Sequence, residues 1–117
     1  MKVLVCGGRN FHLFDGYKIV NATLSKLHAE KRITCIVTGG ATGADSLAEE
    51  WAVENRIHVA RYPANWKLHG KSAGPRRNEI MLKTEQPELV VAFPGGAGTQ
   101  DMLRRAKRAG VTCKVVD

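Results

Sequence analysis

A chain of 117 residues is long enough to enclose one hydrophobic core and too short for two, so a single domain spanning residues 1–117 is expected. With 44% hydrophobic and 25% charged residues, the composition excludes a low-complexity chain, and no apolar run reaches the roughly 20 residues that cross a bilayer. The net charge of +7, most of it carried by residues 61–117, favours an anionic partner, either nucleic acid or a small phosphorylated molecule.

The first half of the chain alternates between apolar runs typical of buried strands and segments with helical periodicity. Residues 2–6 form the first apolar run, which ends at a pair of glycines. Residues 14–31 repeat apolar side chains at helical spacing. A second strand over residues 33–38 also ends at two glycines, and a helix over 42–55 and a third strand over 57–61 follow.

The second half opens with a polar stretch, residues 62–74, which is predicted to be irregular. Pro75 suits the first position of a helix that continues to about residue 84. A strand over residues 89–93, a helix over 99–109 and a strand over 111–116 complete the chain. This alternation predicts an α/β, Rossmann-like three-layer sandwich with a five-stranded parallel sheet in the order 3-2-1-4-5.

Three cysteines, Cys6, Cys35 and Cys113, lie in strand-like segments and lack the spacing typical of zinc ligands. They are interpreted as reduced, apolar filling residues. The N-terminal apolar run is too short for a signal peptide, so a cytoplasmic protein is expected. No metal ion, cofactor or membrane is predicted as a partner.

Three glycine-rich turns follow predicted strands and support the functional hypothesis. They span residues 7–10, 39–45 and 95–99, after the first, second and fourth strand. In the order 3-2-1-4-5 these strands are neighbours, and ligands of open α/β sheets bind at the carboxyl ends of strands, where the strand order reverses. We therefore expect the turns to converge on one crevice, where backbone N–H groups and helix N-termini can bind a phosphate.

The predicted ligand- or phosphate-binding residues come from these turns and from the helix that Pro75 opens. They are Gly7, Gly8, Arg9, Gly39, Gly40, Thr42, Gly43, Arg76, Arg77, Asn78, Gly95, Gly96, Gly98 and Thr99. Arg76 and Arg77 differ by about 100° around a helix, so at most one of them is expected to face the crevice. Neither GxxxxGK[ST] nor GxGxxG occurs, which argues against a P-loop nucleotidase and an ordinary dinucleotide-dependent oxidoreductase.

Several side chains leave a structural and a functional interpretation open. Thr42 and Asp45 fit the capping-box pattern [ST]-x-x-[DE], so Asp45 either caps its own helix or accepts a hydrogen bond from a ribose hydroxyl. Asp101, in the first turn of the last helix, is either favoured there by the helix dipole or catalytic. Thr99 is either a helix cap or a phosphate ligand. Trp66 either covers the edge of the sheet or stacks on a base.

Four motifs, distributed over nearly the whole chain, resemble the SLOG superfamily, in particular its small YspA/YpsA-related branch of bacteria and phages. They are Gly7-Gly8-Arg9, TGGATGAD at residues 38–45, GPRRN at residues 74–78 and PGGAGT at residues 94–99. The resemblance implies a Rossmann-like domain that senses or processes nucleotides and nucleotide-derived ligands. The LOG branch of the superfamily contains phosphoribohydrolases of cytokinin nucleotides, and its DprA branch binds single-stranded DNA.

The LOG signature, PGGxGTxxE with an arginine four residues before a methionine, is matched only in part. Arg77 and Met81 match the pair, but Met102 stands where the resemblance implies a glutamate. A carboxylate is needed there to stabilise a ribosyl cation or to activate water. Asp101 is one residue away, about 100° around the helix, and could substitute only if the helix start is shifted.

Three hypotheses follow. The first is a sensor or sequestering domain that binds a nucleotide-derived small ligand without cleaving it. The second is an N-glycosidic hydrolase of nucleoside monophosphates, with Arg77 on the phosphate and Asp45 or Asp101 as the catalytic carboxylate. The third is a single-stranded nucleic-acid binder, whose contacts are Trp66, Arg76, Arg77, Arg104, Arg105, Lys107 and Arg108. A homodimer is expected because so short a sheet leaves apolar helix faces to cover.

Overall fold

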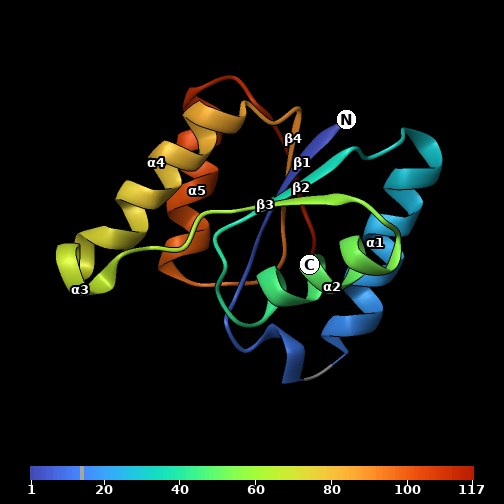
Figure 1. The fold of residues 1–117 in the computed structure, drawn as a ribbon, viewed down its shortest axis with the longest axis horizontal. Helices are drawn as coiled ribbons and strands as arrows, with labels where there is room; N and C mark the ends of the chain where they lie inside the picture. The colour runs from blue at the N-terminus through green and yellow to red at the C-terminus, as the bar shows by residue number, and fades with distance from the viewer. Residues whose placement is uncertain (14) are drawn as a thin grey trace.

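The apolar runs form the strands of one parallel sheet in the computed structural model, which describes residues 1–13 and 15–117 (Figure 1). The strands are β1 (Lys2–Cys6), β2 (Cys35–Thr38), β3 (His58–Arg61), β4 (Leu89–Ala92) and β5 (Thr112–Val115). Their order is β3-β2-β1-β4-β5, which confirms the predicted five-stranded Rossmann-like sheet. The central strand β1 places Leu4 beside Val37 on one side and Val90 on the other.

Helices connect consecutive strands and lie on both faces of the sheet (Figure 1). The longer ones are α1 (Gly16–Glu30), α2 (Ala44–Glu54), α4 (Ala73–Glu85) and α5 (Ala97–Arg108). Short helical turns are η1 (Phe11–Leu13), α3 (Trp66–His69) and η2 (Gly70–Ser72). The predicted start of the first helix at residue 14 lies outside the described residues. None of the described helices is long and apolar enough to cross a membrane.

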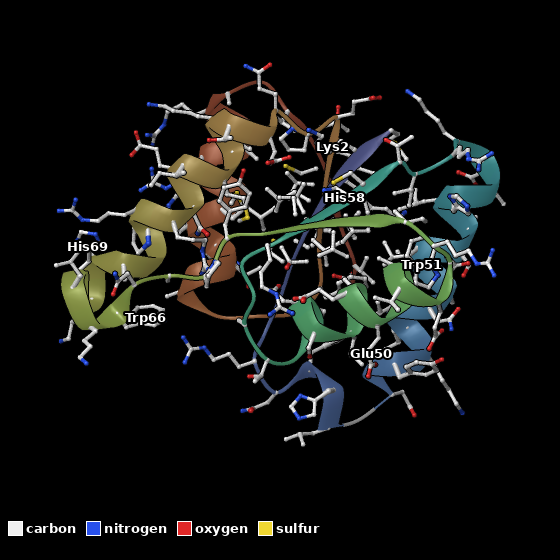
Figure 2. The ribbon with its side chains drawn as sticks, viewed as in Figure 1. Lys2, Glu50, Trp51, His58, Trp66 and His69 are labelled. Atoms are coloured by element: carbon white, nitrogen blue, oxygen red, sulfur yellow. The ribbon has the colours of Figure 1, made fainter. Side chains whose placement is uncertain are left out.

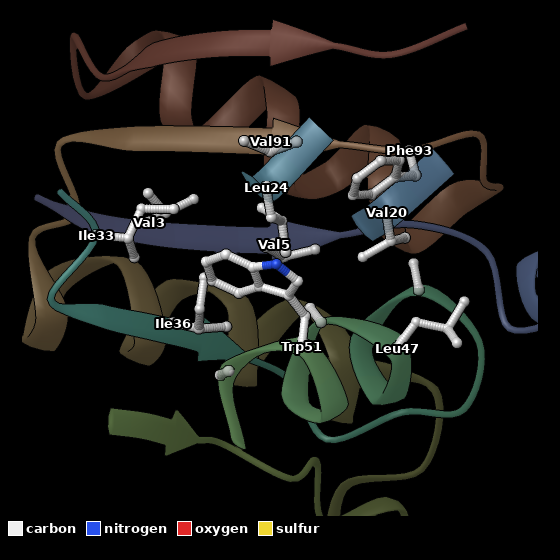
Figure 3. Close-up of a cluster of buried hydrophobic side chains, with 13 residues drawn as sticks. Val3, Val5, Val20, Leu24, Ile33, Ile36, Leu47, Trp51, Val91 and Phe93 are labelled. Atoms are coloured by element: carbon white, nitrogen blue, oxygen red, sulfur yellow. The ribbon is translucent and has the colours of Figure 1, made fainter. Parts of the chain in front are cut away.

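One face of the sheet is covered by α1 and α2, and a tryptophan fills the space between them. Trp51 of α2 is 2% exposed and packs in one cluster with Val5 of β1 and Leu24 of α1 (Figure 3). Its indole Nε1 donates to the hydroxyl of Ser25 (3.0 Å), so the one polar atom of the ring has a partner. This apolar layer fixes α2, whose first residues border the carboxyl end of β2.

The other face is covered by α4 and α5. Leu4 and Val37 point to this side, as the alternation of side chains along a strand requires, and pack against Met81 of α4 and Met102 of α5. Met102 is completely buried. Since β1 is followed by α1 on one face and β4 by α5 on the other, the strand order reverses between β1 and β4. Ligands of open α/β sheets bind at such a point.

Residues 62–74, which were predicted to be irregular, are helical from Trp66 onward. Asn65 begins this segment, and its side-chain oxygen accepts a hydrogen bond from the Leu68 amide (3.1 Å), as an N-cap does. The helical periodicity is missing because the apolar side chains of this segment, Trp66 and Leu68, are exposed instead of packed on the core. Pro75 is consequently the third residue of α4 and not its first.

Candidate functional site

A cavity of about 490 Å³, here called the main cavity, lies at the carboxyl ends of the central strands, between the glycine-rich turns and the first residues of α4 and α5. It brings together the majority of the predicted site residues. Those that line it are Gly7, Gly8, Arg9, Gly39, Asp45, Arg77, Asn78, Gly96, Gly98, Thr99 and Asp101. The three glycine-rich turns and the first half of α4, which are far apart in the sequence, therefore share one cavity, as the strand order predicts for the turns.

The three glycine-rich turns are bonded to one another through Gly8. The Gly8 amide donates to the carbonyl oxygen of Pro94 (2.8 Å), and the Gly8 carbonyl accepts a hydrogen bond from the Ala44 amide (3.2 Å). A Cβ on Gly8 would lie 2.9 Å from the Pro94 oxygen, so only glycine allows this approach. Gly43, at φ +81°, has the left-handed conformation that glycine favours and packs against the Gly8 carbonyl.

Arg77 is the most strongly fixed cation of the main cavity. Its Nη1 donates to the carbonyl oxygens of Gly39 (2.6 Å) and Tyr62 (3.3 Å), and its Nε donates to Oδ1 of Asn78 (3.0 Å). Burial lowers the pKa of this guanidinium, while the charge of Asp45 opposes the decrease. The Nη2 group has no acceptor among the described residues, so it is the part of Arg77 that can bind an anion.

Asp45 is 6% exposed and holds the turn that follows β2. Its Oδ2 accepts hydrogen bonds from the Gly39 amide (3.1 Å) and the Ala41 amide (3.2 Å). Thr42 and Asp45 therefore do not form the capping box that their spacing allows: α2 has Gly43 as its N-cap, and the carboxylate accepts hydrogen bonds from the preceding turn. Burial raises the pKa of Asp45 to about 6, although the hydrogen bond from Ala41 and the charge of Arg77 oppose the increase.

Asn78 connects Arg77 to the second carboxylate of the cavity, Asp101. It is 4% exposed, and its Nδ2 donates to Oδ2 of Asp101 (3.0 Å) and to the carbonyl oxygen of Gly98 (3.3 Å). Burial acts to raise the pKa of Asp101, but hydrogen bonds from Asn78 and Arg105 outweigh it, so this pKa lies below its ordinary value. Asp101 is thus an ionised carboxylate on the cavity wall.

Two expectations about the last helix are corrected. The helix begins at Ala97, two residues before the predicted start, so Asp101 lies in the second turn and not in the first. The hydrogen bonds that Asn78 and Arg105 donate to Asp101 account for its lowered pKa. Met102, which stands where the resemblance implies a glutamate, is a buried core residue of α5 and does not line the cavity.

Arg9 and Trp66 form one rim of the main cavity. The guanidinium carbon of Arg9 lies 5.4 Å from the centroid of the Trp66 ring, a distance typical of a cation–π contact. Trp66, the first residue of α3, is 47% exposed and lies on the opposite side of the molecule from the buried Trp51 (Figure 2). The tryptophan therefore lines the cavity.

Some predicted residues lie outside the main cavity. Gly40 and Thr42 line a smaller cavity of about 330 Å³ beside it, here called the side cavity. Gly43, Gly95 and Arg76 line neither cavity in the described part of the chain. Gly43 and Gly95 pack against the backbone of Gly8, and Arg76 points to solvent, with Nε donating to the Ser72 hydroxyl (3.0 Å).

Among the residues of the main cavity that sequence reasoning assigned to other roles or to none are Cys6, Ala41 and Arg104. Cys6, interpreted as an apolar filling residue, lines the main cavity as the last residue of β1, and burial raises its pKa to about 12. Arg104, assigned to the outer basic face of the last helix, also lines the cavity, 3.9 Å from Asp101. Its position three residues after Asp101 was the signal that both share one helix face. Ala41 also lines the main cavity, and nothing in the sequence marked it as a site residue.

Comparisons with known proteins show a family and a fold for this chain. The sequence pattern of the YspA, cpYpsA-related SLOG family matches residues 1–69. The chain is similar to the Gene 61 protein of Mycobacterium phage D29, with 33% identity over 117 aligned positions that cover 94% of this chain and 91% of the phage protein.

Two solved structures share the fold. The X-ray structure of TM1055 matches with a TM-score of 0.73 at 18% identity, over 96% of this chain and 71% of TM1055. The C-terminal domain of the PF1911 hydrogenase from Pyrococcus furiosus matches with a TM-score of 0.55 at 20% identity, over 98% and 90% of the two chains. At these identities the likeness supports the Rossmann-like fold alone.

Proposed function

Because the chain belongs to the YspA, cpYpsA-related SLOG family, we propose that it binds a phosphate-bearing, nucleotide-derived small ligand in the main cavity, as a sensor or sequestering domain. The observation that carries this proposal is the arrangement of Arg77. Two backbone carbonyls and Asn78 hold its guanidinium on the cavity wall, and Nη2 remains for the ligand. A fixed, planar guanidinium suits the oxygens of a phosphate.

The charges around the main cavity support an anion that carries hydroxyl groups. The lining cations are Arg9, Lys71, Arg77 and Arg104. Asp45 and Asp101 line the same cavity, and carboxylates accept hydrogen bonds from ribose hydroxyls in many nucleotide sites. A volume of about 490 Å³ lies within the usual range for small-ligand sites, about 300–1,000 Å³.

The proposal is tested by calorimetric titration with AMP and with adenosine, which lacks the phosphate. We expect AMP to bind at least about tenfold more tightly, because the phosphate contacts Arg77. Arg77→Lys should remove most of this preference, since lysine cannot keep the two carbonyl contacts and still present a planar fork. Arg76→Lys is the matched control, because Arg76 is exposed and lines neither cavity. Equal affinities for AMP and adenosine contradict the proposal.

We propose N-glycosidic hydrolysis of a nucleoside monophosphate as a second candidate function, on one specific observation. Two carboxylates with opposite pKa shifts line one cavity: the pKa of Asp45 is raised to about 6 and that of Asp101 is lowered. Such a pair suits acid–base chemistry, with ionised Asp101 stabilising the ribosyl cation and protonated Asp45 acting as the acid. The bond between C1′ and the base nitrogen would break as Asp45 donates its proton to that nitrogen, and water would add a hydroxyl to C1′ and return a proton to Asp45.

This candidate predicts that free adenine appears when the protein is incubated with AMP, as measured by chromatography. Asp101→Asn should abolish the release while AMP binding persists. Glu50→Gln, on the exposed side of α2, is a control that should leave the release unchanged. Absence of adenine at high protein concentration removes the hydrolase and leaves the binding proposal intact.

A further inference from the structure

The side cavity adjoins the main cavity along a shared wall. Both cavities are lined by Arg9, Gly39, Ala41, Trp66 and Arg77. Beyond that wall, the side cavity is lined by Gly40, Thr42, Pro63 and Ala64. These residues come from the turn after β2 and the segment after β3, so the side cavity extends the site toward β3.

Charged side chains are distributed unequally between the two cavities. The two arginines are the charged residues of the shared wall, as far as the structure describes it. Asp45 and Asp101 line only the main cavity, and no acidic side chain among the described residues lines the side cavity. The middle of a ligand that spans both cavities therefore lies beside the two arginines of the shared wall.

Arg9 can add its charge to that of Arg77 at this wall. No carboxylate among the described residues lies within ion-pair distance of Arg9, whose side chain contacts the Trp66 ring instead. An exposed cation–π contact contributes only about 0.5–1 kcal/mol, so an anion can draw Arg9 from the ring at small cost. Two guanidinium groups at one wall fit a diphosphate better than a single phosphate.

We propose that the site takes a two-ended nucleotide, a nucleoside diphosphate esterified at its far phosphate with a second ring. This inference rests on the proposed binding function and names its ligand class. The nucleoside occupies the main cavity, where Asp45 and Asp101 accept hydrogen bonds from the ribose, and the diphosphate lies at Arg9 and Arg77. The second ring occupies the side cavity, whose volume of about 330 Å³ lies within the range for small-ligand sites.

The experiment compares the affinities of AMP, ADP, ADP-glucose and diadenosine diphosphate by calorimetry. Both two-ended probes share the esterified diphosphate, and they differ in whether the far ring is a sugar or a nucleoside. We expect at least one of them to bind about tenfold or more tightly than ADP, because the side cavity adds contacts that ADP lacks. The tighter of the two identifies the kind of second ring.

Ala64→Trp tests whether the gain comes from the side cavity, because Ala64 lines that cavity alone. The added ring should fill the side cavity and reduce the preference for the two-ended probe over ADP to near unity. Ala22→Trp, on the exposed side of α1, is the matched control and should preserve the preference.

The outcomes separate this inference from the function on which it rests. Binding of AMP with no gain for either two-ended probe overturns the inference and retains the proposed function. A gain that persists in Ala64→Trp places the second ring elsewhere and also overturns the inference. If none of the four probes binds, both the inference and the proposed function are wrong.

Discussion

Arg77 and Gly39 are in such close contact that a side chain at position 39 would displace the guanidinium. Nη1 of Arg77 donates to the Gly39 carbonyl at 2.6 Å, and a Cβ on Gly39 would lie 2.2 Å from the same nitrogen. Real side chains do not approach so closely, so the absence of a side chain at position 39 is what allows the arginine to lie on the cavity wall. The contact also joins β2 to α4 across the site.

The first prediction follows from this contact. Gly39→Ala should displace the guanidinium and lower AMP affinity by about tenfold or more, as measured by calorimetry. In a double-mutant cycle, adding Gly39→Ala to Arg77→Ala should have little further effect, because both substitutions act through the same group. Additive losses would show that Gly39 contributes to binding by another route.

The second prediction concerns the stability of the protein as a function of pH. The pKa of Asp45 is raised from 3.8 to about 6, so below pH 6 the folded state binds a proton that the unfolded state does not yet bind. Proton binding by Asp45 therefore stabilises the folded state as the pH falls, by about 1 kcal/mol between pH 7 and pH 5. Asp45→Asn should lose that gain, measured by urea unfolding at both pH values. An identical pH dependence in the variant would contradict the raised pKa.

The third prediction separates stability from binding at Gly98. This residue is the second of α5, lines the main cavity, and has nothing within 4 Å of the position that a Cβ would take. Gly98→Ala should raise the free energy of unfolding by up to about 1 kcal/mol, since alanine favours helix. It should also weaken AMP binding, because the added methyl group occupies space that the ligand needs. Unchanged affinity would mean that the ligand does not approach α5 here.

The fourth prediction concerns Asn78, which bonds to Arg77, Asp101 and the Gly98 carbonyl at once. Asn78→Ala should lower the free energy of unfolding by about 1–3 kcal/mol, because buried polar groups lose their partners. It should also raise the pKa of Asp101, measured by NMR titration of the carboxyl carbon. Asn21→Ala, on α1, is the control. A stable variant with an unchanged Asp101 pKa would contradict this role of Asn78.

Sequence reasoning gave the strand order and the convergence of the turns because both follow from local signals. Apolar runs closed by glycines mark the ends of β1 and β2, and the parallel arrangement then brings those ends to one edge of the sheet. The helical state of residues 66–74 was missed because its apolar side chains are exposed and produce no periodicity. The start of α5 was placed too late because Gly98 resembles a turn residue, yet it lies inside the helix.

Side-chain partners were predicted less well than backbone positions. Asp45 has the spacing of a helix cap, but its Oδ2 accepts from Gly39 and Ala41, a contact that depends on how the preceding turn folds back. The choice between Arg76 and Arg77 was likewise open in the sequence. It is determined by the Gly39 and Tyr62 carbonyls, which belong to segments 38 and 15 residues away from Arg77.

The two backbone hydrogen bonds of Gly8, to Pro94 and from Ala44, have a consequence for the thermodynamics of binding. Because the three turns are already connected before any ligand arrives, the site is preorganised, and binding need not order separate loops. Little conformational entropy is then lost on association, so a small ligand with few contacts can still bind tightly. Loosening any one of these turns should weaken the contacts that the other two make.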